Sequence, residues 1–288
     1  MIGVGLIGYG LGGAAFHAPL VQAEPRLRLH AVATSRAEQV RRDLPGVAVV
    51  ASPAELLEDP AVELVVVAAP NAVHAELAAA ALRAGRHVVV DKPFTLSVAE
   101  ADELIGLAAA AGRRLSVFHN RRWDSDFLTV RRCLETGLLG DVSSFVSRYD
   151  RFRPVPKGSW KEQDVPGSGV LWDLGPHLID QALLLFGRPE TVWADVGVQR
   201  PGVEAVDYVH LLAVHGDRGS FVTWGLDRQE VDATLTTEVA GLELRGRLAG
   251  VPAAHHAYYA AMAAAVDGQG PVPVTPAEAR DTIAVIEL

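Results

Sequence analysis

Cysteine and lysine are scarce in this 288-residue chain, and each scarcity excludes something. The single cysteine, Cys133, excludes an internal disulfide and a cysteine-rich metal site, so we expect no metal centre and a reducing, cytoplasmic location. Lysine occurs only as Lys92, Lys157 and Lys161 among 26 basic residues. Where arginine is the usual cation, each lysine position is a candidate for a specific task.

Long apolar runs and basic clusters are missing as well. No apolar stretch reaches the roughly 20 residues of a membrane-spanning helix, and the chain enters a predicted strand at once. We therefore expect no membrane association and no signal peptide. The net charge is −9, and the basic pairs 121–122 and 131–132 are short, which predicts no nucleic-acid partner. With 49% hydrophobic residues, the chain can form two domains with sizeable cores.

A glycine-rich turn follows the first apolar run. Residues 2–7 resemble a buried strand, and apolar positions at helical spacing follow the turn, a context typical of dinucleotide-binding sites. Gly8 permits the tight turn, Gly10 lets the backbone approach a pyrophosphate, and Gly13 lets helix and strand pack closely. The predicted cofactor contacts in this turn are Gly8, Tyr9, Gly10, Leu11, Gly12 and Gly13. The alternative is an ordinary strand–helix turn with extra glycines.

Alternating strands and helices continue to about residue 119. We expect strands at residues 2–7, 27–33, 47–50, 64–68, 87–90 and 115–118, with helices between them. This pattern predicts a doubly wound parallel sheet, a Rossmann domain over residues 1–119.

The second strand ends at Ser35 and Arg36, where a Rossmann fold meets the adenosine ribose. An acidic residue there would repel a 2′-phosphate, and none is present. A serine hydroxyl and a guanidinium instead favour NADP(H) over NAD(H). The structural alternative makes Ser35 a helix N-cap and Arg36 a solvated first-turn residue.

Polar residues also follow the fourth and fifth predicted strands. Pro70, Asn71 and His74 are expected at the cofactor, although Asn71 can also cap a helix and His74 can be an ordinary first-turn residue. Lys92 lies next to Pro93 at the end of the fifth strand, where an ammonium can hold a substrate oxygen. Its alternative is a surface lysine in a loop.

Beyond residue 119 the pattern changes to an α+β domain over residues 120–288. We expect a β-rich stretch at 142–151, a helix at 171–186, strands at 191–198, 206–214, 220–224 and 235–239, and helices at 254–266 and 276–288. The sheet should be mostly antiparallel and open, able to leave one face to another subunit of a homo-dimer or tetramer. The last helix, 276–288, can alternatively pack back on the first domain.

Asp173 and His177 lie four residues apart in the predicted helix and would share one face. A histidine beside a carboxylate can move a proton, whereas the alternative is a core histidine with Asp173 as a cap. Polar residues suited to a polyol substrate are Asn120, Arg122, Arg151 and Arg153.

Four motifs in this order resemble the Gfo/Idh/MocA oxidoreductase family: residues 8–13, 70–74 (Pro-Asn-Ala-Val-His), 91–93 (Asp-Lys-Pro) and 173–177 (Asp-Leu-Gly-Pro-His). Residues 119–128 and 149–154 are similar to the branch with NADP-dependent scyllo-inositol dehydrogenases. The resemblance implies a catalytic set of Lys92, Asp173 and His177. In that set His177 exchanges the proton, Lys92 binds the reacting oxygen near the nicotinamide, and Asp173 holds a substrate hydroxyl or orients the site.

Two departures from the family pattern stand out. Asp91 replaces the more usual glutamate, and the stretch between Trp224 and Ala254 appears shortened, with Leu288 ending the chain inside a predicted helix. We expect an NADP(H)-dependent oxidoreductase acting on a secondary alcohol or ketone of a cyclitol or sugar. The alternatives are a non-catalytic NADP- or sugar-sensing protein and a reductase of the dihydrodiol or biliverdin type.

Overall fold

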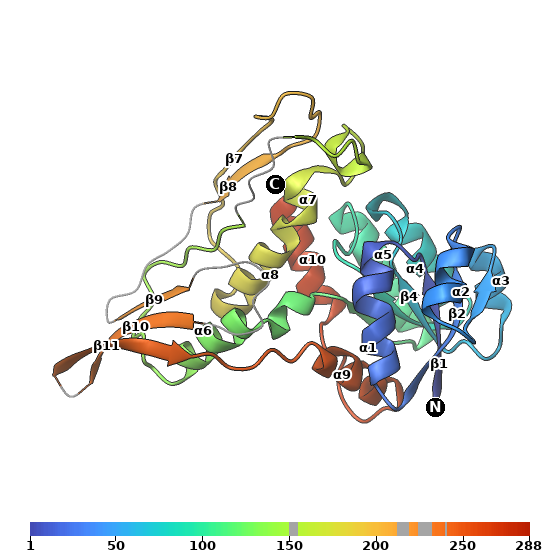
Figure 1. The fold of residues 1–288 in the computed structure, drawn as a ribbon, viewed down its shortest axis with the longest axis horizontal. Coiled ribbons are helices and arrows are strands. Elements are labelled where there is room, and N and C mark those ends of the chain that lie inside the picture. Colours follow the sequence, from blue (N-terminus) through green and yellow to red (C-terminus); the bar gives the residue numbers. More distant parts are fainter. Residues whose placement is uncertain (150–154, 212–218, 224–231, 240) are drawn as a thin grey trace. The chain divides into compact units, whose positions relative to one another are not determined.

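The computed structural model describes residues 1–149, 155–211, 219–223, 232–239 and 241–288, which form two units (Figure 1). Unit 1 comprises residues 1–119 and 256–288, and unit 2 comprises residues 120–255. The sequence-based prediction differs, because it assigned residues 256–288 to the second domain and allowed only 276–288 to pack back. The physical reason is burial: Tyr258, Tyr259 and Met262 of this segment are fully buried.

Unit 1 is built on one parallel sheet. In spatial order its strands are β3 (Ala48–Val50), β2 (Leu27–Ala33), β1 (Ile2–Ile7), β4 (Leu64–Val67), β5 (His87–Val90) and β6 (Leu115–Val117). All neighbouring pairs run parallel, and β1, β4 and β6 are buried along their whole length. This strand order is that of the doubly wound dinucleotide-binding fold, which confirms the predicted Rossmann architecture.

The helices between these strands begin and end where local sequence signals place them. They are α1 (Ala18–Ala23), α2 (Ala37–Asp43), α3 (Pro53–Glu58), α4 (His74–Arg83) and α5 (Val98–Ala111), with a π turn η1 (Gly13–His17) before α1 and a 3-10 turn η2 (Asn71–Val73) before α4. Helix α5 illustrates the cause. Ser97 and Glu100 form a capping box at its start, and Gly112, at φ +62°, ends it.

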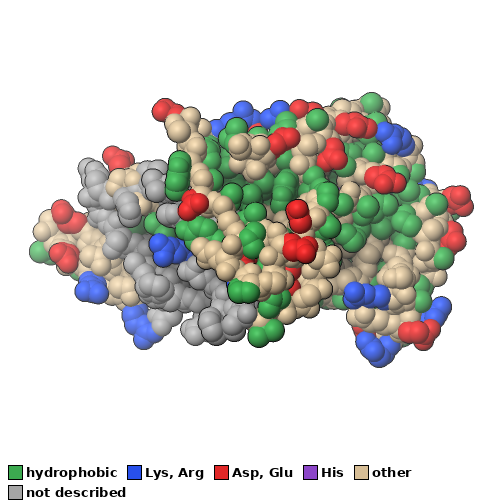
Figure 2. All heavy atoms as spheres, turned by 90° about the horizontal axis from the view of Figure 1, so that it is seen from above, with side chains coloured by type: hydrophobic (Ala, Val, Ile, Leu, Met, Phe, Trp, Pro, Cys, Tyr) green, Lys and Arg blue, Asp and Glu red, His purple; other side chains and the backbone are tan. Residues whose placement is uncertain are grey.

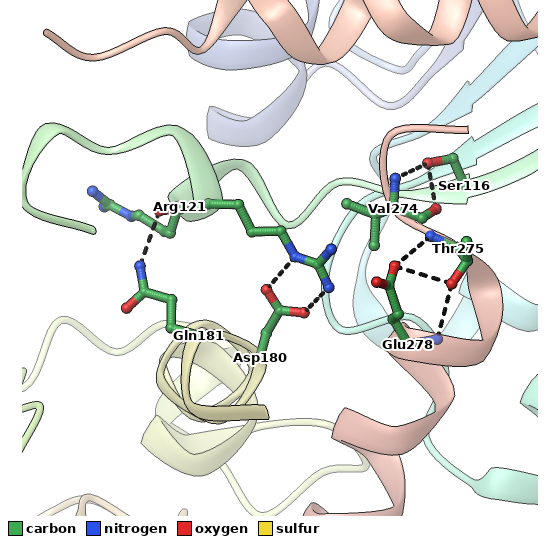
Figure 3. Close-up of polar contacts among 8 residues, drawn as sticks. Ser116, Arg121, Asp180, Gln181, Val274, Thr275 and Glu278 are labelled. Atoms are coloured by element: carbon green, nitrogen blue, oxygen red, sulfur yellow. Dashed lines mark hydrogen bonds and ion pairs between the residues drawn. The ribbon is translucent and has the colours of Figure 1, made fainter. Parts of the chain in front are cut away.

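Two helices from the end of the chain complete unit 1, namely α9 (His256–Val266) and α10 (Pro276–Ile286). The Tyr258 hydroxyl donates to Ser116 Oγ of β6 at 2.9 Å, and Ser116 in turn donates to the Val274 carbonyl at 2.8 Å (Figure 3). Arg280 of α10 pairs with Asp102 of α5. The sheet and these helices therefore form one core.

Unit 2 combines helices with antiparallel strands. Its helical elements are η3 (Asn120–Trp123), α6 (Ser125–Glu135), η4 (Trp160–Glu162), α7 (Gly169–Asp173) and α8 (Gly175–Phe186). Its strands are β7 (Ala194–Gly197), β8 (Tyr208–Leu211), β9 (Gly219–Thr223), β10 (Asp232–Val239) and β11 (Leu242–Ala249). They pair as β7–β8 and as β9–β10–β11, all antiparallel, which agrees with the predicted α+β class.

Several predicted elements of unit 2 need correction. The β-rich stretch at 142–151 forms no strand over its described part, residues 142–149, and residues 150–151 lie outside the described residues. The predicted helix 171–186 is two helices, because Leu174 departs from regular helical geometry between α7 and α8 (φ −115°, ψ −33°). Strand β11 was not predicted. Residues 212–214 and 224 of the predicted strands lie outside the described residues.

The surface carries charges of both signs. On the face drawn in Figure 2, Lys and Arg side chains lie in small groups separated by acidic and uncharged side chains. This arrangement gives no support to an extended nucleic-acid-binding surface on that face. None of the helices in the described ranges combines the length and apolar character needed to cross a membrane.

Candidate functional site

The turn after β1 is packed so tightly that two of its positions require glycine. Gly8 has φ +97°, its N–H donates to the Ala33 carbonyl at 2.9 Å, and a Cβ there would lie 2.4 Å from the Ala68 oxygen. A Cβ at Gly13 would lie 2.3 Å from the Gly8 oxygen. Only a residue without a side chain fits either position, which explains the closeness of turn and helix.

The outer side of the turn is open. A Cβ at Gly10 would meet no atom of the described chain within 4 Å, and Leu11 is 77% exposed, whereas Tyr9 is buried. The helix begins here, and its first N–H groups lack intrahelical partners. An open concave backbone at a helix start suits a pyrophosphate, so the residues present fit a dinucleotide.

Asp91 connects this turn to Lys92. Its Oδ1 accepts the Lys92 backbone N–H at 2.8 Å, and its Oδ2 lies where a Cβ of Gly12 would come within 2.7 Å. The peptide bond between Lys92 and Pro93 is cis, and the Lys92 side chain is half-buried. A side chain at Gly12 would therefore have to displace the Asp91 carboxylate, a constraint that the sequence motif alone did not reveal.

The charge state of Asp91 follows from its neighbours. Burial alone would raise the pKa of this carboxyl, but the adjacent His17, with Lys92 and His74, lowers the pKa to about 2. His17 Nε2 lies 3.6 Å from Asp91 Oδ2, an ion-pair distance. The carboxyl is thus ionised throughout the neutral range.

The His74 side chain supports the surrounding loops and is not open to a ligand. The ring is fully buried, with Nδ1 2.8 Å from the Pro93 oxygen and Nε2 2.9 Å from the Ala69 oxygen. Burial lowers its pKa, so the neutral ring donates one hydrogen bond at a time. We correct its predicted role as a cofactor contact accordingly, because His74 joins the loops after β4 and β5. Pro70 is exposed and Asn71 half-exposed at the same edge of the sheet.

Ser35 and Arg36 lie exposed after β2. Helix α2 begins at Ala37 with Arg36 in the cap position and no side-chain cap bond, so Ser35 is not the N-cap of the structural alternative. The Arg36 N–H donates to Thr34 Oγ1 at 3.0 Å. Within the described part of the chain, no carboxylate lies at ion-pair distance from Arg36, which leaves its guanidinium available to a ligand.

In unit 2, Asp173 ends α7 and has a partner that the sequence-based prediction did not name. Lys161 Nζ, from η4, donates to Asp173 Oδ1 at 2.7 Å, and the same ammonium lies 5.8 Å from the centre of the Trp160 ring. Both charged side chains are partly exposed, Lys161 at 43% and Asp173 at 27%. The scarcity of lysine was the signal that could have singled out Lys161.

His177 lies in the first turn of α8, directly after Pro176. Its side chain is 7% exposed, and its N–H donates to the Leu174 carbonyl at 3.1 Å. Pro176 occupies the start of the helix, where it removes no internal hydrogen bond. The break at Leu174 places Asp173 and His177 on successive helices and not on one.

Arg122 requires a correction. Its Nε and Nη2 donate to both carboxylate oxygens of Asp180 at 2.8 and 2.6 Å, and both side chains are buried. Gln181, next on α8, donates to the Arg121 carbonyl at 2.9 Å, so two successive residues attach η3 to α8 (Figure 3). We treat Arg122 as structural, because a buried guanidinium needs its paired carboxylate. Asn120 is buried on η3. Arg151 and Arg153 lie outside the described residues.

Each unit therefore assembles part of the predicted site. In unit 1 the Asp91 carboxylate lies beside Gly12 of the glycine turn and accepts the Lys92 N–H, and unit 2 holds Asp173 and His177 on either side of Leu174. Sequence reasoning missed His17, Tyr259 and Lys161, and it treated Asp91 only as a motif variant. The contacts of His17 and Tyr259 span 242 positions along the chain, beyond any local pattern.

The parallel sheet, its strand order and the glycine turn define unit 1 as a dinucleotide-binding domain of the Rossmann type. The comparisons with known proteins give the family. Residues 2–119 match the model of the oxidoreductase family with NAD-binding Rossmann fold, GFO_IDH_MocA, and residues 127–243 match a GFO/IDH/MocA C-terminal domain. The chain belongs to the Gfo/Idh/MocA oxidoreductase family.

Two relatives are informative. The uncharacterized oxidoreductase YdgJ of Escherichia coli is 42% identical over 328 aligned positions, covering 100% of this chain and 95% of YdgJ. The scyllo-inositol 2-dehydrogenase (NADP(+)) IolW of Bacillus subtilis is 40% identical, covering 80% of this chain and 70% of IolW. Since this chain has 288 residues, 328 minus 288 leaves 40 positions of the YdgJ alignment without a residue here.

Solved structures agree with this fold. The oxidoreductase yvaA of Bacillus subtilis superimposes with a TM-score of 0.92 at 35% identity, covering 100% of this chain and 95% of that one. An oxidoreductase from Klebsiella pneumoniae gives a TM-score of 0.87 at 43% identity, covering 99% and 91%.

Proposed function

We propose that this protein transfers a hydride between NADP(H) and a secondary alcohol or ketone of a cyclitol or sugar. The observation that carries the proposal is the position of Asp91, whose carboxylate accepts the Lys92 backbone N–H and lies beside Gly12 of the dinucleotide turn, where a Cβ would come within 2.7 Å of it. A cationic side chain is thereby held at the edge of the sheet where such folds bind their ligands. The similarity to IolW supports a polyol as the substrate class.

Each proposed site residue has a task. Bound nicotinamide supplies or accepts the hydride. Lys92 holds the reacting oxygen and stabilises its negative charge, and His177 accepts the proton in oxidation or donates it in reduction. Asp173, oriented by Lys161, accepts a hydrogen bond from a substrate hydroxyl. We propose Asn120 as a further polar contact, and Arg151 and Arg153 keep the substrate role that the sequence indicates.

The preference for NADP(H) rests on residues 34–36. Ser35 and Arg36 are exposed at the end of β2, and the Arg36 side chain makes no cap hydrogen bond to α2 although this residue occupies the cap position. A guanidinium there can pair with the 2′-phosphate, and no acidic residue repels it. The name of IolW, an NADP(+) enzyme, is consistent with this assignment.

The direct test is NADP+ reduction, followed by absorbance, against a panel of inositols and sugars. We expect Lys92→Arg to bind NADPH but lose about a hundredfold or more in kcat, because Arg cannot reproduce a compact ammonium at the reacting oxygen. His177→Ala should fall by about a hundredfold or more. Lys157→Arg, a change at an exposed lysine, is the matched control and should retain wild-type turnover.

Full activity of Lys92→Arg on a confirmed substrate would reduce Lys92 to a structural residue. NADPH binding without turnover of any panel compound, including ketones in the reductive direction, would favour a sensing protein.

Cofactor choice is tested at Arg36. We expect Arg36→Ala to lower kcat/KM for NADP+ by about tenfold while leaving kcat/KM for NAD+ within about twofold, because one phosphate contact is lost. Arg41→Ala, on the same helix but paired with Glu38, is the control. Equal or tighter binding of NAD(H) by the unchanged protein contradicts the assignment.

We further propose that the protein works in the cytoplasm as a homo-dimer or tetramer formed through the sheets of unit 2. Supporting this, Val196 of β7 and Leu242 and Leu244 of β11 are 47%, 68% and 52% exposed. Exposed apolar strand faces of this kind are typical of subunit contacts. Light scattering coupled to size exclusion measures the mass, and a monomer at micromolar concentration contradicts the proposal.

A further inference from the structure

A largely buried set of three polar side chains lies beside the glycine turn, and the function proposed above uses only one of them, Asp91. The set comprises His17 of the π turn η1, Asp91 after β5 and Tyr259 of α9, all within unit 1. His17 Nδ1 lies 2.6 Å from the Tyr259 hydroxyl, and His17 Nε2 lies 3.6 Å from Asp91 Oδ2. The His17 and Tyr259 side chains are fully buried.

Burial, with the nearby Tyr258 and Asp91, raises the pKa of Tyr259 well above its usual range, so the phenol keeps its proton and can donate to His17 Nδ1. The other ring nitrogen, Nε2, is buried and lies 3.6 Å from Asp91 Oδ2, beyond hydrogen-bond distance. In the tautomer that accepts from Tyr259, the Nε2 N–H would be the group nearest this carboxylate.

Packing alone does not require these polar groups. The His17 ring lies 4.2 Å from the Phe118 ring, and Tyr259 contacts Phe118 and Tyr258. Apolar residues of similar volume would pack in such surroundings without the desolvation cost of three polar groups. The π turn is a second unusual feature at the same place, since such turns are rare and recur at functional sites.

We propose that His17 and Tyr259 are positioning residues of the dinucleotide site. They hold the Asp91 carboxylate, which accepts the Lys92 backbone N–H and occupies the space beside Gly12 of the glycine turn. The effect on turnover rests on the proposed function, because it acts through Lys92. The effect on dinucleotide binding acts through the glycine turn and does not depend on any substrate.

The test compares two tyrosines that are neighbours on α9. Tyr259→Phe removes the hydroxyl that contacts His17, and Tyr258→Phe removes the hydroxyl that donates to Ser116. Both changes delete one buried hydrogen bond and keep the ring, so both should lower the melting temperature similarly. Only Tyr259→Phe should weaken NADPH binding, by about three- to tenfold, because only its hydroxyl orients His17 toward Asp91. Tryptophan fluorescence quenched by NADPH measures the dissociation constant.

A second pair of variants separates positioning from filling of space. His17→Gln keeps an amide donor, whereas His17→Leu keeps volume and removes every donor. We expect His17→Leu to weaken NADPH binding more than His17→Gln does, and kcat on a confirmed substrate to fall in the same order. Equal dissociation constants for Tyr259→Phe and Tyr258→Phe would overturn the proposal. So would equal values for the two His17 variants.

Failure of the proposed function has a different signature. In that case no polyol is turned over, yet NADPH binding still ranks the four variants as stated. If NADPH binding follows the ranking while kcat on a confirmed substrate does not, the part of the proposal that concerns Lys92 is overturned.

Discussion

Units 1 and 2 bury their strands very differently. In unit 1, every residue of β1, β4 and β6 is buried, whereas in unit 2 nearly every residue of β11 is exposed and none of β7 is buried. A parallel sheet is covered on both faces by its own crossover helices, while an antiparallel sheet can leave one face open. Apolar burial is therefore complete along β1, β4 and β6 of unit 1, and we expect unit 2 to depend more on individual polar contacts.

Three polar contacts lie where the chain enters and leaves unit 2. Arg122 pairs with Asp180 inside the unit, Asp124 lies 2.5 Å from His255, and Ser125 Oγ donates to the Val251 carbonyl. Ion pairs and hydrogen bonds thus hold residues 122–125 to residues 251–255 or to α8. This contrast between the units predicts that replacing a single polar side chain lowers the free energy of unfolding more in unit 2 than in unit 1.

The largest effect should come from Arg122→Met. This change leaves the Asp180 carboxylate buried without its partner, and we expect a loss of about 3–5 kcal/mol in the free energy of unfolding of unit 2. Urea unfolding, followed by hydrogen exchange to resolve the two units, measures it. The double variant Arg122→Met with Asp180→Leu should recover most of the loss.

The matched control in unit 1 is Asp102→Asn, which breaks the exposed pair with Arg280. Exposed pairs contribute little, so its effect should be far smaller than that of Arg122→Met. Comparable losses for the two variants would contradict the contrast between the units.

The second-largest effect should be a loss of stability of unit 1 at acid pH. Because the pKa of Asp91 is lowered from 3.8 to about 2, its ionised form stabilises the fold above pH 4. That contribution is lost as the pH falls from about 4 to 2, and it amounts to about 2 kcal/mol. We expect Asp91→Asn to be less stable than the unchanged protein at pH 7 by this amount, with the two curves converging near pH 2. If the difference in stability between Asp91→Asn and the unchanged protein did not vary between pH 7 and pH 2, the role of His17 beside the carboxylate would be contradicted.

The smallest effect should be Lys161→Met, which removes the partner of Asp173 without emptying a core. We expect about a tenfold fall in kcat/KM for a polyol, since an unoriented carboxylate binds the hydroxyl less well, with NADPH affinity unchanged. Lys157→Met removes an exposed lysine nearby and is the control. Equal activities of the two variants would show that Lys161 does not orient Asp173.

Much of unit 1 could be predicted from sequence because its signals are local. Continuous apolar runs predicted the strands, and the glycine spacing predicted the turn. In unit 2 the short strands and the helix break at Leu174 depend on tertiary contacts. Strand β11 was missed although Leu242, Leu244 and Leu248 alternate with charged residues, because that region was interpreted only as a deletion.

The candidate site divides in the same way. Lys92, Asp173 and His177 were predicted from motifs and stay predictions, whereas the burial of Arg122 against Asp180 was not predictable, since it joins residues 58 positions apart. His74 was placed at the correct strand end, yet its two ring nitrogens face backbone carbonyls. A sequence indicates which residues have the chemistry to bind a ligand. Packing decides which of those side chains are already bonded to other parts of the protein.

The return of residues 256–288 to unit 1 has a consequence for biosynthesis. The ribosome delivers His17 early and Tyr259 242 residues later, which at 5–20 residues per second is a delay of about 10–50 s. Until then the first 119 residues lack α9 and α10, and the hydroxyl that orients His17 does not yet exist. The nascent Rossmann sheet must therefore wait for the whole of unit 2 before its cofactor turn is fully supported. A fragment ending at residue 119 should accordingly be aggregation-prone, whereas co-expression with residues 256–288 supplies the missing helices.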